Sequence, residues 1–63
     1  MPIVYISMLQ GRTVEQKEKL IKKVTDSICE VLQISKDRVR MTIIEVPKEN
    51  VGVGGIPATK LDL

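Results

Sequence analysis

Residues 1–9 are almost entirely apolar and rich in β-branched side chains. This pattern predicts a strand, in which successive side chains point to opposite faces. The even positions form one face, the odd positions from Ile3 to Leu9 form the other, and both faces are largely apolar. A strand of this kind is expected to be covered on both sides, as in a parallel sheet or in the core of an oligomer.

A helix is predicted directly after the loop at residues 10–12. Thr13 and Gln16 have the spacing of a capping box, in which each side chain accepts a hydrogen bond from the backbone amide of the other. Apolar residues then recur at helical spacing along roughly 19 residues and form a single stripe. The stripe comprises Leu20, Ile21, Val24, Ile28, Val31 and Leu32. We expect it to pack on a sheet.

A second strand is predicted at residues 39–46, where β-branched side chains are again frequent. The polar residues 35–38 before it are expected to form one helical turn capped by Ser35. A helix between two strands makes a right-handed crossover, so the strands should be parallel and the helix should cover one face. The predicted fold class is therefore α+β, with a β-α-β subunit. Two strands alone do not make a stable sheet, so other copies of the chain are expected to complete it.

The C-terminal part of the chain changes character after Pro47. Glycines at positions 52, 54 and 55, with Pro57 beyond them, predict a flexible loop or a short hairpin. The segment lacks the Lys-Ser/Thr pair of a phosphate-binding loop and has the wrong spacing for a dinucleotide fingerprint. We therefore interpret it as a turn or as a contact segment between subunits.

The length and composition point to self-association as well. Sixty-three residues correspond to one domain, residues 1–63, whose core is too small to supply much stability alone. The chain has one aromatic residue, one cysteine and no histidine, which excludes a disulfide framework and leaves a metal site without its usual ligands. Assembly into a homo-oligomer is the source of stability that remains.

The charge pattern argues against nucleic acid as a partner. Ten basic and eight acidic residues leave a net charge of only +2, and the lysines of the predicted helix are interleaved with acids. No apolar run approaches the length of a membrane span, and no signal-peptide pattern opens the chain. We expect a cytoplasmic protein with neither a nucleic-acid nor a membrane partner.

The most unusual candidate for acid–base chemistry lies at the N-terminus. Pro2 is a small second residue, so an aminopeptidase is expected to remove Met1 and expose a proline amine. Such an amine is mainly protonated at neutral pH, because an ordinary α-amino group titrates at about 7.7–8.0. Burial and nearby cations would lower the pKa of the amine and allow it to act as a general base.

Five segments of the chain together resemble one known family. They are Pro2-Ile3-Val4, Leu9-Gln10-Gly11-Arg12, Glu15-Gln16-Lys17, Val39-Arg40 and Gly52-Val53-Gly54-Gly55. The combination spans essentially the whole chain and is similar to the 4-oxalocrotonate tautomerase family. The resemblance implies a mature chain that begins with the proline, and a homohexamer built as three dimers of β-α-β subunits. No cofactor is expected.

The resemblance also implies roles for five residues. Pro2 corresponds to the catalytic amine that transfers a proton on a dienol acid, and Arg40 to the arginine that binds a carboxylate and the neighbouring 2-oxo oxygen. Arg12 corresponds to the arginine that holds the distal carboxylate of a small dicarboxylate substrate. Leu9 and Val51 are expected to contact the substrate, Val51 where the family usually has an aromatic residue.

The chemistry of the two arginines agrees with these roles. A guanidinium stays charged at any working pH and can bind carboxylate oxygens bidentately, so two of them select a dicarboxylate and lower the pKa of a nearby amine. Arg12 lies in a loop, where an arginine taken alone is more often a solvated surface residue. Arg40 lies within an otherwise apolar strand and is expected to need a buried partner or an anionic ligand.

The function expected from these features is the keto–enol tautomerisation of a 2-hydroxydienoate such as 2-hydroxymuconate, in the degradation of aromatic compounds. Two alternatives stay open. A hydratase or dehalogenase on the same scaffold would need a carboxylate to activate water, and Glu49 is the only acid in the C-terminal loop. A self-assembling module without catalytic activity would not depend on a free N-terminus.

Overall fold

The computed structural model describes residues 1–62 and contains the predicted strand, helix and strand in that order. The strand β1 covers Ile3–Leu9, the helix α1 Val14–Leu32 and the strand β2 Arg40–Val46. The 3-10 helix η1, Lys36–Arg38, connects α1 to β2. The C-terminal elements are the 3-10 helix η2 (Lys48–Asn50), the short strands β3 (Gly52–Val53) and β4 (Ile56–Pro57), and the 3-10 helix η3 (Ala58–Lys60).

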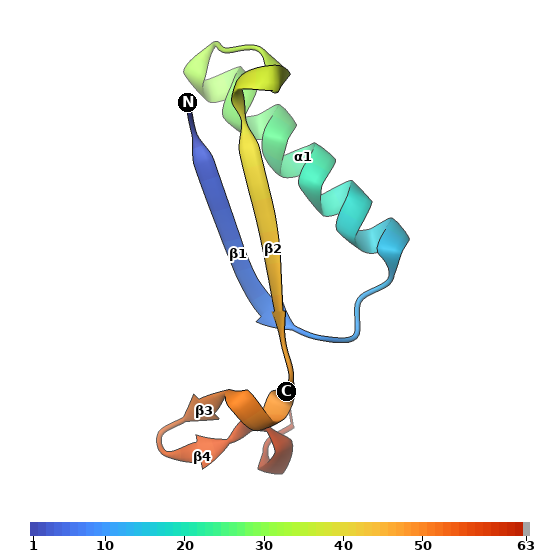
Figure 1. Ribbon diagram of the computed structural model, residues 1–63, viewed down its shortest axis with the longest axis vertical. Coiled ribbons are helices and arrows are strands. Elements are labelled where there is room, and N and C mark those ends of the chain that lie inside the picture. Colours follow the sequence, from blue (N-terminus) through green and yellow to red (C-terminus); the bar gives the residue numbers. More distant parts are fainter. Residues whose placement is uncertain (63) are drawn as a thin grey trace.

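The strands β1 and β2 pair in parallel, which confirms the predicted crossover. Their register runs from Ile3 opposite Arg40 to Leu9 opposite Val46. A parallel pair cannot be closed by a tight turn, so the 19-residue helix α1 provides the return path. Corresponding ends of the two strands therefore lie side by side, and the loops that follow Leu9 and Val46 start from the same edge (Figure 1).

The helix α1 begins at the predicted capping box. The Thr13 hydroxyl accepts from the Gln16 amide at 3.1 Å, and the Gln16 side-chain oxygen accepts from the Thr13 amide at 3.0 Å. The helix ends at Gln33, whose φ of 58° lies in the left-handed region and stops further helical hydrogen bonding. The predicted turn after it exists as η1, but Ser35 makes no side-chain capping bond there. No helix in residues 1–62 has the length and apolar character needed to cross a membrane.

The sheet formed by β1 and β2 is covered on one face only. Val4 and Ile6 share one face of β1 and are half-buried, and so is Ile43 opposite Ile6. The helix α1 lies along the sheet (Figure 1). On the other face, Ile3 and Tyr5 expose 61% and 67% of their surface. The predicted apolar character of both faces is therefore present, and a single chain supplies a cover for just one of them.

The apolar stripe of α1 is wider than the sheet beneath it. Leu20, Val24 and Ile28 are half-buried, whereas Val31 and Leu32 expose 77% and 54% of their surface. The expectation that the whole stripe packs on the sheet is therefore wrong for a single chain. Two strands are too narrow to receive every apolar position of a helix of this length, so Ile21 as well as the C-terminal Val31 and Leu32 remain in contact with solvent.

The C-terminal segment contains the short hairpin that the glycines allowed. The strands β3 and β4 pair antiparallel, with Gly52 opposite Pro57. Gly54 and Gly55 connect them with φ values of 60° and 83°, the left-handed conformation that a two-residue hairpin turn requires. This region extends beyond the end of β2, away from α1 (Figure 1).

The chain alone has almost no interior. Its radius of gyration is 14.7 Å, compared with about 10.6 Å for a compact domain of this length. Among residues 1–62, Ala58 is the one fully buried residue. The apolar residues of the strands and helix can be removed from water only by contact with other molecules, which supports the expectation of self-association.

Candidate active site

Pro2 and Arg40 lie together at the start of the two strands. The Arg40 amide donates a hydrogen bond of 3.0 Å to the Pro2 carbonyl, as an extension of the parallel ladder. Pro2 is half-buried and Arg40 is exposed. The structure thus places next to each other the two residues that the sequence proposes for catalysis, and it does so through backbone pairing.

The Arg40 side chain does not have the buried partner expected from its position in an apolar strand. Its guanidinium is exposed and donates from Nη1 to the Asp37 carbonyl at 2.8 Å. Because Arg40 is the first residue of β2, its side chain reaches solvent at the end of the sheet. No carboxylate within residues 1–62 forms an ion pair with it. A guanidinium has five N–H donors, so most remain able to bind an anion.

The segment that precedes Arg40 is tied to α1 by an ion cluster around Asp26. Lys22 donates to Asp26 Oδ2 at 2.8 Å, and Lys36 in η1 lies 3.3 Å from Oδ1. The Lys22 ammonium, and after it that of Lys36, hold the pKa of Asp26 below its ordinary value of 3.8. Because Asp37 follows Lys36 directly, this exposed cluster connects α1 with the turn whose carbonyl accepts from Arg40.

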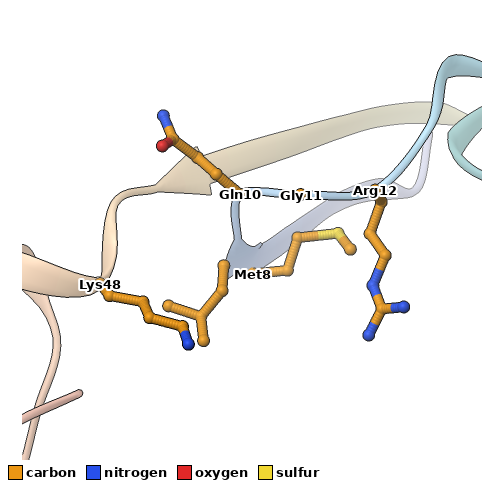
Figure 2. Close-up of a pocket in the computed structure, with 6 residues that line it drawn as sticks. Met8, Gln10, Gly11, Arg12 and Lys48 are labelled. Atoms are coloured by element: carbon orange, nitrogen blue, oxygen red, sulfur yellow. The ribbon is translucent and has the colours of Figure 1, made fainter. Parts of the chain in front are cut away.

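A pocket of about 310 Å³ lies at the opposite end of β1, and it contains Leu9 and Arg12. Its full lining is Met8, Leu9, Gln10, Gly11, Arg12 and Lys48. Figure 2 shows the Arg12 and Lys48 side chains on the same side of the loop, with Met8 between them and Gln10 pointing to the other side. Gly11 has a φ of 124°, a conformation that side chains rarely adopt, and it allows the chain to turn toward α1.

The charge of this pocket is uniformly positive. Its lining contains two cations and no carboxylate. None of the lysines that form ion pairs in residues 1–62 lines this pocket, although Lys17, which is paired with Glu45, lines an adjoining cavity that shares Met8 and Arg12. Met8 and Leu9 supply an apolar wall beside the cations. The pocket can therefore bind an anionic group that is attached to a short apolar body.

Lys48 is a candidate residue that the sequence analysis did not identify. The parallel register contained the signal, because Leu9 lies opposite Val46 and the Gln10 amide donates to the Val46 carbonyl at 3.0 Å. Residues shortly after the two strands, such as Arg12 and Lys48, must then lie near one another. Arg12 and Lys48 are 36 positions apart in the sequence, and only the pairing of β1 with β2 brings their segments together. The residues around Lys48 do not distinguish it from a surface lysine.

Val51 lies outside the described pocket. It follows η2, is half-buried, and its carbonyl accepts from the Ala58 amide at 2.7 Å. The structure thus brings together Leu9 and Arg12, and separately Pro2 and Arg40, but leaves Val51 near the base of the hairpin. Among residues 1–62, no three His, Cys, Asp or Glu side chains gather into a group that could hold a metal ion.

The two pairs of site residues are separated by the length of the sheet. Ile3 lies opposite Arg40, and Leu9 is six residues farther along β1. At a rise of ~3.3 Å per residue, this corresponds to about 20 Å. A small organic acid cannot span that distance, so Pro2 and Arg12 of the same chain cannot contact one substrate molecule.

Comparison with known proteins assigns the family of the chain. The model of a family described as "Tautomerase enzyme" matches residues 2–60. A 2-hydroxymuconate tautomerase from Pseudomonas putida is 45% identical over 62 residues, which cover 98% of each chain. The structure of a heterohexamer 4-oxalocrotonate tautomerase from Chloroflexus aurantiacus matches with a TM-score of 0.91 at 34% identity, covering 98% of this chain and 100% of its own. A 4-oxalocrotonate tautomerase isozyme from Methylibium petroleiphilum matches with a TM-score of 0.89 at 45% identity, covering 95% and 97%. The chain therefore belongs to the tautomerase enzyme family, and it is an isomerase.

Proposed function

We propose that the protein converts a 2-hydroxydienoate, such as 2-hydroxymuconate, to its 2-oxo isomer, with the amine of Pro2 as the general base after removal of Met1. The observation that carries the proposal is the pairing of Pro2 with Arg40, whose backbones are joined by a hydrogen bond of 3.0 Å from the Arg40 amide to the Pro2 carbonyl. The similarity to 2-hydroxymuconate tautomerases supports the choice of substrate. Such a six-carbon dienol diacid has the composition expected of a product of aromatic-ring cleavage.

The proton transfer balances without any co-reactant. The neutral Pro2 amine accepts the proton of the 2-hydroxyl group, and the C2–O bond becomes a carbonyl as the double bonds shift along the chain. The resulting ammonium then gives the proton to C5, which restores the neutral amine. The same group acts first as base and then as acid, which requires a pKa close to the working pH.

The two arginines have different roles in this reaction. Arg40, beside Pro2, stabilises the negative charge that develops on the C2 oxygen and binds the adjacent carboxylate. Arg12 binds the carboxylate at the other end of the diacid. Leu9 packs on the carbon chain between the two carboxylates. Val51, between η2 and the hairpin, adds apolar surface to the site.

The distance between the Pro2–Arg40 pair and the Leu9–Arg12 pair implies that subunits share an active site. About 20 Å of strand lies between them in one chain, so the Arg12 that serves a given Pro2 must come from another copy. We propose a homo-oligomer, a hexamer of three dimers, in which the uncovered face of Ile3 and Tyr5 is buried. The structural similarity to a heterohexamer tautomerase supports this assembly.

The state of the N-terminus tests the function directly. Protein with Met1 removed should accelerate the ketonisation of 2-hydroxymuconate, followed by the loss of dienol absorbance. Protein in which Met1 is retained should be inactive, because the Pro2 nitrogen is then an amide. Pro2→Ala after Met1 removal should be slower but active, since it keeps a primary amine.

Equal activity with the nitrogen blocked would contradict the assignment of Pro2. Hydration or dehalogenation of small unsaturated acids without tautomerisation would favour the alternative enzyme class, although Glu49, its candidate acid, does not line the described pocket. If the folded oligomer without Met1 does not accelerate any of these reactions, the result would favour a non-catalytic self-assembling module.

A further inference from the structure

A second cation, Lys48, shares the pocket of Arg12. We infer that Lys48 and Arg12 together bind the distal carboxylate of the substrate, so that Lys48 is a determinant of the preference for diacids over monoacids. This inference rests on the proposed function, because it concerns the distal end of the same substrate. The segment after β2, which includes η2, then takes part in substrate binding.

The backbone of Lys48 is held in place at the edge of the pocket. Pro47 before it has a φ of −72°, which the proline ring restricts, and the Lys48 carbonyl accepts from the Val51 amide at 3.1 Å. Two residues before Lys48, the Val46 carbonyl accepts from the Gln10 amide at 3.0 Å. The loop of Arg12 and the turn of Lys48 are therefore joined by the last hydrogen bond of the ladder.

The side chain of Lys48 has no carboxylate partner in the described chain. The ion pairs there involve Lys17, Lys22 and Lys36. Glu49, the acid adjacent in sequence, is not part of the pocket lining. Both cations line one pocket whose lining contains no carboxylate, so a carboxylate bound there would be attracted by both charges.

The two cations are chemically complementary. A guanidinium binds two carboxylate oxygens in a fixed planar geometry, whereas an ammonium on a flexible stem can approach a remaining lone pair as a point charge. Met8 and Leu9 provide apolar contact for the carbon chain that bears the carboxylate. The volume of about 310 Å³ is at the small end of ligand sites, which fits a small organic acid.

Kinetics of Lys48→Ala with Met1 removed test the inference. The KM for 2-hydroxymuconate should rise about fivefold, the effect of one exposed ion pair, with little change in kcat. A monoacid 2-hydroxydienoate should be turned over by this variant as by the unmodified sequence, since it has no distal carboxylate. Lys48→Arg should retain most of the affinity for the diacid. Lys60→Ala in η3, which removes an exposed lysine outside the pocket, is the matched control and should change neither substrate.

Binding of unreactive acids gives a second readout that does not depend on catalysis. Titration calorimetry would compare trans,trans-muconate with sorbate, a six-carbon dienoate that carries one carboxylate. Lys48→Ala should weaken muconate binding and leave sorbate binding unchanged. An unchanged affinity for muconate, or an equal loss for both acids, would overturn the role of Lys48. The protein without substitutions could lose muconate affinity on Lys48→Ala and yet fail to isomerise 2-hydroxymuconate. In that case the proposed function fails and the binding role of Lys48 stands.

Discussion

The Arg40 amide donates a hydrogen bond of 3.0 Å to the Pro2 carbonyl, so the positions of the two residues are set by the backbone. The bond belongs to the parallel ladder of β1 and β2, in which Arg40 lies opposite Ile3. No side chain takes part in it. The Arg40 side chain can therefore be changed without loss of the contact that holds the N-terminal segment in place.

Substitution of Arg40 should affect the chemical step. Arg40→Ala removes the charge that stabilises the developing enolate, and kcat for 2-hydroxymuconate should fall by a factor on the order of 10²–10³. Steady-state kinetics of protein from which Met1 has been removed measure this change in kcat. Arg38→Ala, which removes an exposed arginine from η1, is the control and should retain kcat. A rise in KM alone for Arg40→Ala would contradict the assigned role.

Substitution of Arg12 should affect mainly binding. Its proposed partner is the distal carboxylate, which is present in the ground state and the transition state alike, so Arg12→Ala should raise KM with a smaller fall in kcat. A monoacid substrate should be nearly insensitive to the same change. The oligomer must be verified by light scattering for this variant, because an assembly defect would imitate the loss of a shared site. Equal sensitivity of diacid and monoacid would show that Arg12 does not bind the distal group.

The uncovered sheet face should control assembly. The unmodified chain is expected to form dimers at least, and hexamers at micromolar concentration, because Ile3 and Tyr5 are mostly exposed in one chain. Tyr5→Lys places a charge on this face and should shift the mass measured by light scattering toward the monomer, with loss of helical circular dichroism. Lys19→Glu on the exposed side of α1 should leave the mass unchanged. A stable, folded monomer of the unmodified chain would refute the shared-site proposal.

The cluster around Asp26 should make part of the stability depend on pH. Lys22 and Lys36 lower the pKa of Asp26 in the folded chain, so its stabilising contribution is present above the ordinary value of 3.8 and is lost as the pH falls through the lower folded-state pKa. Asp26→Asn should therefore reduce the melting temperature at pH 7, and the difference from the unmodified chain should vanish in strong acid. Glu30→Gln, on the exposed surface of α1, should show no such pattern. A constant difference at every pH would exclude the charge as its cause.

The local elements of this protein follow from short-range patterns in its sequence. Thr13 and Gln16 mark the start of α1, because a capping box depends only on residues three positions apart. The alternation in β1 and the glycines of the hairpin are equally local, and the strand–helix–strand order requires a parallel pair. The likeness of the chain to the tautomerase family was also visible in its motifs, which are short and continuous.

Only the tertiary structure determines which residues that are far apart in the sequence lie close together. The register of β1 against β2 places Lys48 in the same pocket as Arg12, and the length of the strand separates Arg12 from Pro2. The narrow sheet divides the apolar stripe of α1 into a covered part and an exposed part that includes Val31. These relationships depend on hydrogen bonds and packing between segments far apart along the chain. Periodicity and spacing report on neighbours in sequence, so they contain no information about which distant side chains will share a pocket.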